Sequence, residues 1–266
     1  MTRIIIPVVI IIIMVAGYFA VITRQQDASS VTVDIELPSP TKIPAPPVSQ
    51  FPVSEPQVQA EPPKPLPVLD ESDQTVEQEF NGLVNGDNQL AQLFTFKTFV
   101  RNFVVIADNL TATKIPQKFQ FMNPPTGKFM VKKDAAEVTF IDPENHARYL
   151  PFVRLVAAVD VDNLVNIYAY LYPLFQQAYV ELGYPDRNFN DRLIEVISHL
   201  LETPEVPDPI ALVQRKVFYQ FADPELEARS AGQKLLMRTG RENASLLKLK
   251  LNDLLAKLTA LQGLPQ

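Results

Sequence analysis

The stretch LYPLFQQAYVELGYPDRNFNDRLIEVISHLLETP, residues 171–204, decides the fold of this chain. Apolar residues recur in it at intervals of three and four, before and after a central turn, which places each run on one side of a helix. These residues are Leu171, Leu174, Phe175, Ala178, Tyr179 and Leu182, then Phe189, Leu193, Val196, Ile197, Leu200 and Leu201. In the turn, Gly183 suits a residue with positive φ, Pro185 prevents continuation, and Asn188 can cap the next helix. The stretch predicts an antiparallel helical hairpin whose two apolar faces share one core.

Similar but shorter patterns around the hairpin predict a mainly α-helical domain with one small β-hairpin. The further helices are expected over residues 75–84, 90–109, 143–149, 151–159, 162–172, 234–239 and 244–261, and the β-hairpin over 129–132 and 137–141. Helix starts are expected at Ser72, Asp142, Asp162, Asp223 and Ser230. Pro173 predicts a kink or a restart. Residues 210–221 fit either a strand or a helix.

The last helix carries Leu247, Leu251, Leu254, Leu258 and Leu261 at steps of four and three. This seam is about two heptads long, whereas coiled coils usually need three or four. We therefore expect the helix to pack on the core of its own domain rather than in an intermolecular coiled coil.

Composition excludes several kinds of chemistry. The chain has no cysteine, which excludes disulfides, zinc–thiolate sites and thiol nucleophiles. A net charge of −6 argues against nucleic-acid binding, which needs a basic surface. His146 and His199 are the only histidines, and Asp160–Asn163 lacks the later ligands of a calcium loop, so a helix cap at Asp162 explains it better. We expect no cofactor and no bound metal.

Residues 1–24 are expected to form a transmembrane anchor. The run from Ile4 to Ile22 is apolar throughout and about 28 Å long as a helix, which matches the hydrocarbon core of a bilayer. The alternative, a cleaved signal peptide, has a shorter apolar region of about 7–15 residues. The few flanking Lys and Arg residues favour a cytoplasmic N-terminus. The expected location is the bacterial inner membrane, crossed once, with the rest of the chain in the periplasm.

Residues 25–72 are expected to be a disordered, acidic, proline-rich spacer. Eleven of the chain's 24 prolines lie between Pro38 and Pro67, and such a sequence favours polyproline II and excludes a stable helix. A ligand for proline-reading domains is the alternative interpretation. The spacer would hold a third region, residues 73–266, away from the bilayer.

Candidate binding residues gather around the turn of the helical hairpin, where tyrosines, carboxylates and arginines are close in the sequence. They are Tyr184, Asp186, Arg187, Asn190, Asp191 and Arg192. Together with Glu181 and Glu195, the carboxylates fit a glycan-cleaving enzyme, which needs two carboxyl groups about 5–9 Å apart. A solvated polar helix face explains the same residues without any activity.

Several stretches of the chain resemble an uncharacterised bacterial family of membrane-anchored proteins that carry a domain of unknown function. They are FVRNFVVIADNL (99–110), HARYLPFV (146–153), most of 171–204 and PIALVQRKVFYQFADPELEARSAGQKLLMRTGRENA (209–244). The resemblance implies an anchor, a proline-rich spacer and a helical domain, and it implies no activity or catalytic residue.

These observations favour a non-enzymatic envelope protein with an interaction or scaffold domain. Its expected partners are the bilayer, through Ile4 to Ile22, and a protein or another envelope component; the oligomeric state is left open. The alternative is a periplasmic glycan- or peptide-cleaving enzyme that uses carboxylates near residues 183–195. A TonB-like energy transducer also has an anchor and a proline-rich spacer, but this anchor lacks polar residues.

Overall fold

The predicted helical hairpin is confirmed in the computed structural model of the protein, which describes residues 64–260. Its helices are α7 (Val161–Glu181) and α8 (Phe189–Leu201), joined by a turn in which Gly183 has a φ of +115°. Most of the predicted apolar residues are buried, but Leu182 is 37% exposed because the helix ends there and its side chain leaves the core. The expected anchor and most of the expected spacer lie outside the described residues. Within residues 64–260, no helix combines the length and apolarity needed to cross a membrane.

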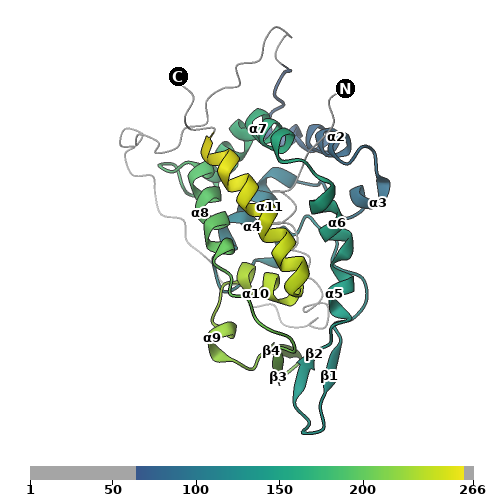
Figure 1. Ribbon diagram of the computed structural model, residues 1–266. Coiled ribbons are helices and arrows are strands. Elements are labelled where there is room, and N and C mark those ends of the chain that lie inside the picture. The colour runs from purple at the N-terminus through teal and green to yellow at the C-terminus, as the bar shows by residue number, and fades with distance from the viewer. Residues whose placement is uncertain (1–63, 261–266) are drawn as a thin grey trace.

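The hairpin is accompanied by other helices, several of which pack around it (Figure 1). In chain order they are η1 (Leu69–Glu71), α2 (Asp73–Leu83), α3 (Asn88–Ala91), α4 (Phe99–Asn109), η2 (Gln117–Phe119), α5 (Asn145–Arg148), α6 (Leu150–Ala158), α9 (Pro224–Glu227), α10 (Ala231–Arg238) and α11 (Arg241–Ala260). The last of them, α11, packs against α6, α7 and α8 through the buried side chains of Leu247, Leu251, Leu254 and Leu258. The expectation that the final helix packs on its own domain is therefore confirmed.

Helix α4 closes the hairpin from the other side through Phe103, which is 1% exposed. The centroid of its ring lies 5.2 Å from that of Phe175 on α7 and 6.1 Å from that of Phe189 on α8. Phe99 and Phe121 extend the cluster at 6.2 and 6.0 Å. Burial of a phenylalanine stabilises a fold by about 1.5–3 kcal/mol, and aromatic pairs add about 0.5–1.5 kcal/mol. This cluster is the centre of the helical core.

Four strands form one antiparallel sheet at the lower end of the molecule in Figure 1, away from α2 and α7. They are β1 (Val131–Lys133), β2 (Thr139–Ile141), β3 (Ala211–Arg215) and β4 (Phe218–Phe221), in the order β1-β2-β3-β4. The predicted β-hairpin is thus present as β1 and β2, and residues 210–221 are strands rather than a helix. One face packs on a second, smaller core, which consists of Ile141, Ile210, Leu212, Phe221 and Met237.

Two expectations about helix continuity are wrong, the second only in part. Residues 90–109 are not one helical region, because the chain leaves α3 and Phe94 pairs in a β-bridge with Met122 before α4 begins. Thr98, directly before α4, has a φ of +50°, which a continuous helix does not allow. Pro173 does not restart the helix, since α7 continues through it.

The capping residues are confirmed in part. Asp223 and Ser230 accept hydrogen bonds from the N–H groups of Glu225 and Gln233, as expected of helix caps. At α7 the cap is Asp160, not Asp162, because the side chain of Asp160 accepts the N–H of Asp162. Ser72 and Asn188 stand at the cap positions of α2 and α8, but neither side chain caps the helix there.

Gly232 allows α10 to approach α4 and α8 closely. A Cβ at this position would lie 2.5 Å from Cδ2 of Leu200 and 3.0 Å from the carbonyl oxygen of Leu110. The N–H of Gly232 donates to the same carbonyl, so the two backbones are held at this distance by a hydrogen bond.

We predict that Gly232→Ala lowers the free energy of unfolding by about 1–3 kcal/mol, because the new methyl group overpacks this contact. Gly82→Ala is the matched control, since a Cβ on Gly82 in α2 would meet nothing within 4 Å. It should raise the free energy of unfolding by roughly 0.5–1 kcal/mol through helix propensity. Urea unfolding followed by circular dichroism measures both, and equal effects of the two substitutions would contradict the prediction.

Candidate functional site

Two of the predicted site residues, Tyr184 and Arg192, meet at Asp108 near the C-terminal end of α4. The Nε of Arg192 donates to Oδ1 of Asp108 at 2.7 Å, and its Nη2 donates to the carbonyl oxygen of Asp108 at 2.6 Å and to Oγ1 of Thr111 at 2.7 Å. The Tyr184 hydroxyl donates to Oδ2 of Asp108 at 3.2 Å. The side chains of Arg192 and Asp108 are only 20% and 14% exposed. This arrangement fastens α8 and the turn to α4, so its polar groups already have partners.

The turn itself is held by Gln176 of α7. Its Oε1 accepts the N–H of Phe189 at 2.8 Å and the hydroxyl of Tyr172 at 3.0 Å, while its Nε2 donates to the carbonyl oxygen of Arg187 at 2.9 Å. Asp186 and the side chain of Arg187 lie exposed beyond these contacts. Of the predicted residues, Tyr184 and Arg192 are therefore bound within the fold, whereas Asp186 and Arg187 are exposed.

Asn190 and Asp191, the remaining predicted residues, begin α8 on its inner side. Asn190 is fully buried, and its Nδ2 and Oδ1 have no hydrogen-bond partner among residues 64–260. Burial raises the pKa of the Asp191 carboxyl above its ordinary value, against a hydrogen bond from Asn188 that lowers it. Neighbouring tyrosines are affected in the same direction: burial raises the pKa of Tyr172 to about 12.

The tyrosines around the hairpin mostly belong to the core. Tyr168 and Tyr179 are buried, while Tyr170, Tyr172 and Tyr184 are partly exposed and pack against the same cluster. The rings of Tyr179 and Tyr184 stack with centroids 4.6 Å apart. Burial raises the pKa of Tyr179 to about 12, with a further contribution from the charge of Asp108.

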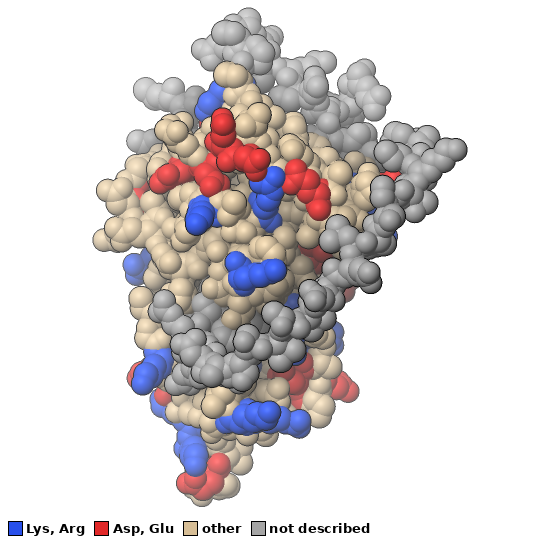
Figure 2. All heavy atoms as spheres, turned by 180° about the vertical axis from the view of Figure 1, so that it is seen from behind, with Lys and Arg blue, Asp and Glu red and all other residues tan. Residues whose placement is uncertain are grey.

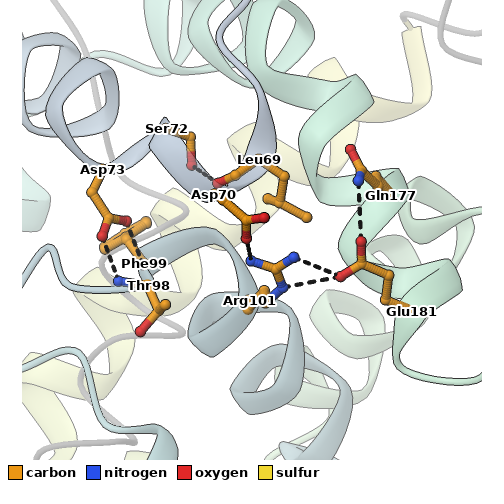
Figure 3. Close-up of polar contacts among 9 residues, drawn as sticks. All are labelled: Leu69, Asp70, Ser72, Asp73, Thr98, Phe99, Arg101, Gln177 and Glu181. Atoms are coloured by element: carbon orange, nitrogen blue, oxygen red, sulfur yellow. Dashed lines mark hydrogen bonds and ion pairs between the residues drawn. The ribbon is translucent and has the colours of Figure 1, made fainter.

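A second polar cluster, which the sequence did not predict, lies where η1 and α2 meet α4 and α7 (Figure 3). Arg101 of α4 binds Asp70 through Nη1 at 2.6 Å and Glu181 of α7 through Nη2 at 2.9 Å. The second carboxylate oxygen of Glu181 accepts a hydrogen bond from Gln177 at 3.1 Å. Seen from behind, acidic side chains gather near this upper end of the molecule, with basic ones among and below them (Figure 2).

Asp73 completes this second cluster by capping a helix other than its own. Its carboxylate accepts the N–H of Thr98 at 2.6 Å and that of Phe99 at 2.9 Å, at the start of α4. These donors have no partner within α4, and an anion at a helix N-terminus is stabilising. Thr98, at the cap position of α4, is a residue type that often caps a helix, but its side chain makes no such bond here, so no local pattern in the sequence pointed to Asp73.

Residues 64–73, here called the strap, connect to the helical body at further points. The Tyr170 hydroxyl donates to the carbonyl oxygen of Pro65 at 3.1 Å. The ammonium of Lys64 lies 5.5 Å from the centroid of the Tyr170 ring and pairs with Glu79 of α2. Leu69 is buried in the core. The strap is thus attached near both of its ends, while Leu66 and Val68 between them are exposed.

The profile of one protein family matches residues 99–255, more than half of the chain. The chain belongs to DUF3014, a family described as protein of unknown function. This confirms the predicted resemblance to a domain of unknown function. No curated protein and no solved structure matches the chain. The matched residues of DUF3014 include α4, the hairpin and α11, whereas the strap and α2 precede them.

Within the DUF3014 region, His199 and Ser230 form a pair that resembles part of a catalytic triad. Nε2 of His199 lies 2.9 Å from Oγ of Ser230. The same Oγ caps α10 by accepting the N–H of Gln233. The next two N–H groups, of Ala231 and Gly232, donate to carbonyl oxygens before α10 and are not free to stabilise an oxyanion. The pair therefore has a structural role, in which His199 contacts the serine that caps α10.

Metal binding has no support from the described part of the DUF3014 protein. Among residues 64–260, no three His, Cys, Asp or Glu side chains lie together in a way that could hold an ion. Asp162 pairs with Lys257 of α11, and Asp160 caps α7, so the aspartates there have structural partners. Of the carboxylates near the turn, Glu181 pairs with Arg101 and Glu195 pairs with Arg192 at 3.2 Å.

We predict that Asp108→Asn lowers the free energy of unfolding by about 2 kcal/mol, because it weakens a half-buried, charge-assisted contact between α4 and α8. Glu195→Gln is the control: it removes the other carboxylate bound to Arg192, but Glu195 is 62% exposed. Its loss should cost less than about 0.5 kcal/mol. Chemical denaturation of the two variants measures the difference. A cost at Glu195 as large as that at Asp108 would contradict it.

Proposed function

We propose that this protein is a single-pass membrane protein whose DUF3014 domain binds a partner in the bacterial envelope, at a distance set by a proline-rich spacer. The apolar run from Ile4 to Ile22 supports the anchor, and the prolines between Pro38 and Pro67 support the spacer. The proposed orientation places the N-terminus in the cytoplasm and the domain in the periplasm.

The observation that carries this proposal is the attachment of the strap. Contacts at Lys64, Pro65, Asp70 and Asp73 hold it against α2, α4 and α7. A spacer that arrives at Lys64 therefore meets the domain at one defined place, near the upper end in Figure 1. The sheet lies at the opposite end of the described part of the domain.

A binding role agrees with how the polar residues are used. Arg192, Tyr184 and Glu181 hold helices together, so they are not available to a substrate. Asp186 and Arg187 are exposed at the turn and are available to a partner. A scaffold or interaction domain needs a stable shape and exposed contacts, and residues 64–260 provide both.

The proposed topology can be tested by labelling, because the chain contains no cysteine. Leu249 on α11 is 67% exposed, so Leu249→Cys should leave the fold intact. In intact bacterial cells made permeable only in the outer membrane, an impermeant maleimide should label this variant. It should label Thr2→Cys only after the inner membrane is opened. The reverse pattern would invert the orientation, and loss of both variants into the soluble fraction would exclude the anchor.

One observation favours the alternative function, a glycan- or peptide-cleaving enzyme. A general acid needs a raised pKa, and burial raises the pKa of Asp191. If this alternative holds, the full-length protein releases soluble fragments from cell-wall material, and Asp191→Asn reduces the rate at least about 100-fold. Asp186→Asn is the control on the exposed side of the turn and should retain the rate. Under the binding proposal, no fragments are released by any of the three proteins.

A further inference from the structure

The strap has the geometry of a bound proline-rich peptide. Pro65 and Pro67 have φ values restricted by their rings, and Val68 has a φ of −70° and a ψ of 150°, which is polyproline II. A tyrosine hydroxyl donates to the carbonyl of Pro65, and a carboxylate binds the flanking Lys64. Aromatic side chains line the grooves that commonly bind such peptides.

The strap runs beside α7 in a direction that can be extended. Arg101 joins Asp70 of the strap to Glu181 of α7, and Tyr170 of α7 binds the carbonyl of Pro65. From Asp70 to Pro65 the strap covers roughly 14 Å, at about 2.0 Å for the step within η1 and about 3.1 Å for each of the other four, and the step from Glu181 to Tyr170 covers roughly 16 Å at 1.5 Å per residue. The two segments therefore have similar lengths, with about two residues of α7 for each residue of the strap.

An apolar cavity lies beside this part of α7, between Leu164 and Phe175. It has a volume of about 40 Å³ and lies between α2 and α7. Its lining includes Val76, Phe80 and Leu83 of α2 and Leu164, Ile167 and Leu171 of α7. Glu79, which binds Lys64, is at its edge. The cavity is roughly a quarter of the size of one that holds benzene, about 150 Å³, so it suits a single small apolar side chain and excludes a lipid chain.

We propose that this cavity and the neighbouring face of α7 bind the proline-rich segment that immediately precedes Lys64, with the rings of Pro62 and Pro63 over the cavity. Three residues upstream of Pro65 correspond to about six residues of α7, which brings Pro62 level with Leu164. The segment has to begin at the cavity because Lys64 is fixed at Glu79. The spacer is then docked up to this point, and its free length begins before Pro62. The inference does not depend on membrane insertion.

Two pairs of adjacent prolines provide a matched test in the full-length protein. Pro62→Ala/Pro63→Ala should lower the Tm of the domain by about 2–4 °C, because it removes rings that pack on α2 and α7. Pro46→Ala/Pro47→Ala changes the same dipeptide further upstream and should leave Tm unchanged. Thermal unfolding in detergent, followed by circular dichroism, compares the two. The same Tm for both double variants would overturn the proposal.

A nitroxide label reports docking independently of stability. Ala60→Cys should give a broad, immobilised spectrum, whereas Ala45→Cys should give a narrow, mobile one. Tyr170→Phe, which removes the hydrogen bond to Pro65, should narrow the spectrum at residue 60 and leave that at residue 45 unchanged. Equal mobility at both positions would overturn docking. Immobilisation that disappears on dilution would show that a second copy supplies the segment, which also contradicts docking within one chain.

Discussion

The burial of Phe103 between α7 and α8 is the interaction on which the structure depends. Its ring contacts Phe175 on one helix and Phe189 on the other, so a single side chain of α4 holds both halves of the hairpin. α11 covers the hairpin through its four buried leucines. The hydrophobic effect is non-directional, so burial alone does not set the angle between two helices. Contacts between aromatic rings have preferred geometries and therefore help to set that angle.

Polar residues in this fold act mainly between elements. Asp73 is the first residue of α2, and α3 also lies between it and α4, yet it caps the start of α4. Asp108, close to the end of α4, binds Arg192 of α8. Arg101, in the first turn of the same helix, joins the strap to α7. α4 is thus fastened at its start to the strap and α7, and near its end to α8. A change in the strap therefore directly alters the contacts of α4, the helix that closes the core.

The sequence predicted where the candidate site lies, but not what each of its residues does. Tyr184 and Arg192 were grouped correctly near the turn, because both flank a break in a strong helical pattern. Their common partner, Asp108, is far away in the sequence, and no local pattern connects it to them. The pair of His199 and Ser230 was missed for the same reason, since it joins α8 to the start of α10. Local spacing carries no information about such distant contacts.

The sequence by itself determined the helical hairpin, the packing of the last helix and the membership in a helical class, because apolar spacing of three and four residues is a local property. Only the tertiary structure decided that residues 210–221 are strands: β3 pairs with β2 and β4, and this pairing overrides an ambiguous local preference. It also decided the break before α4, where the bridge between Phe94 and Met122 competes with helix formation. The tertiary structure also decided which carboxylates near the turn are available to a ligand. Glu181 and Glu195 pair with arginines in the fold, so they are not.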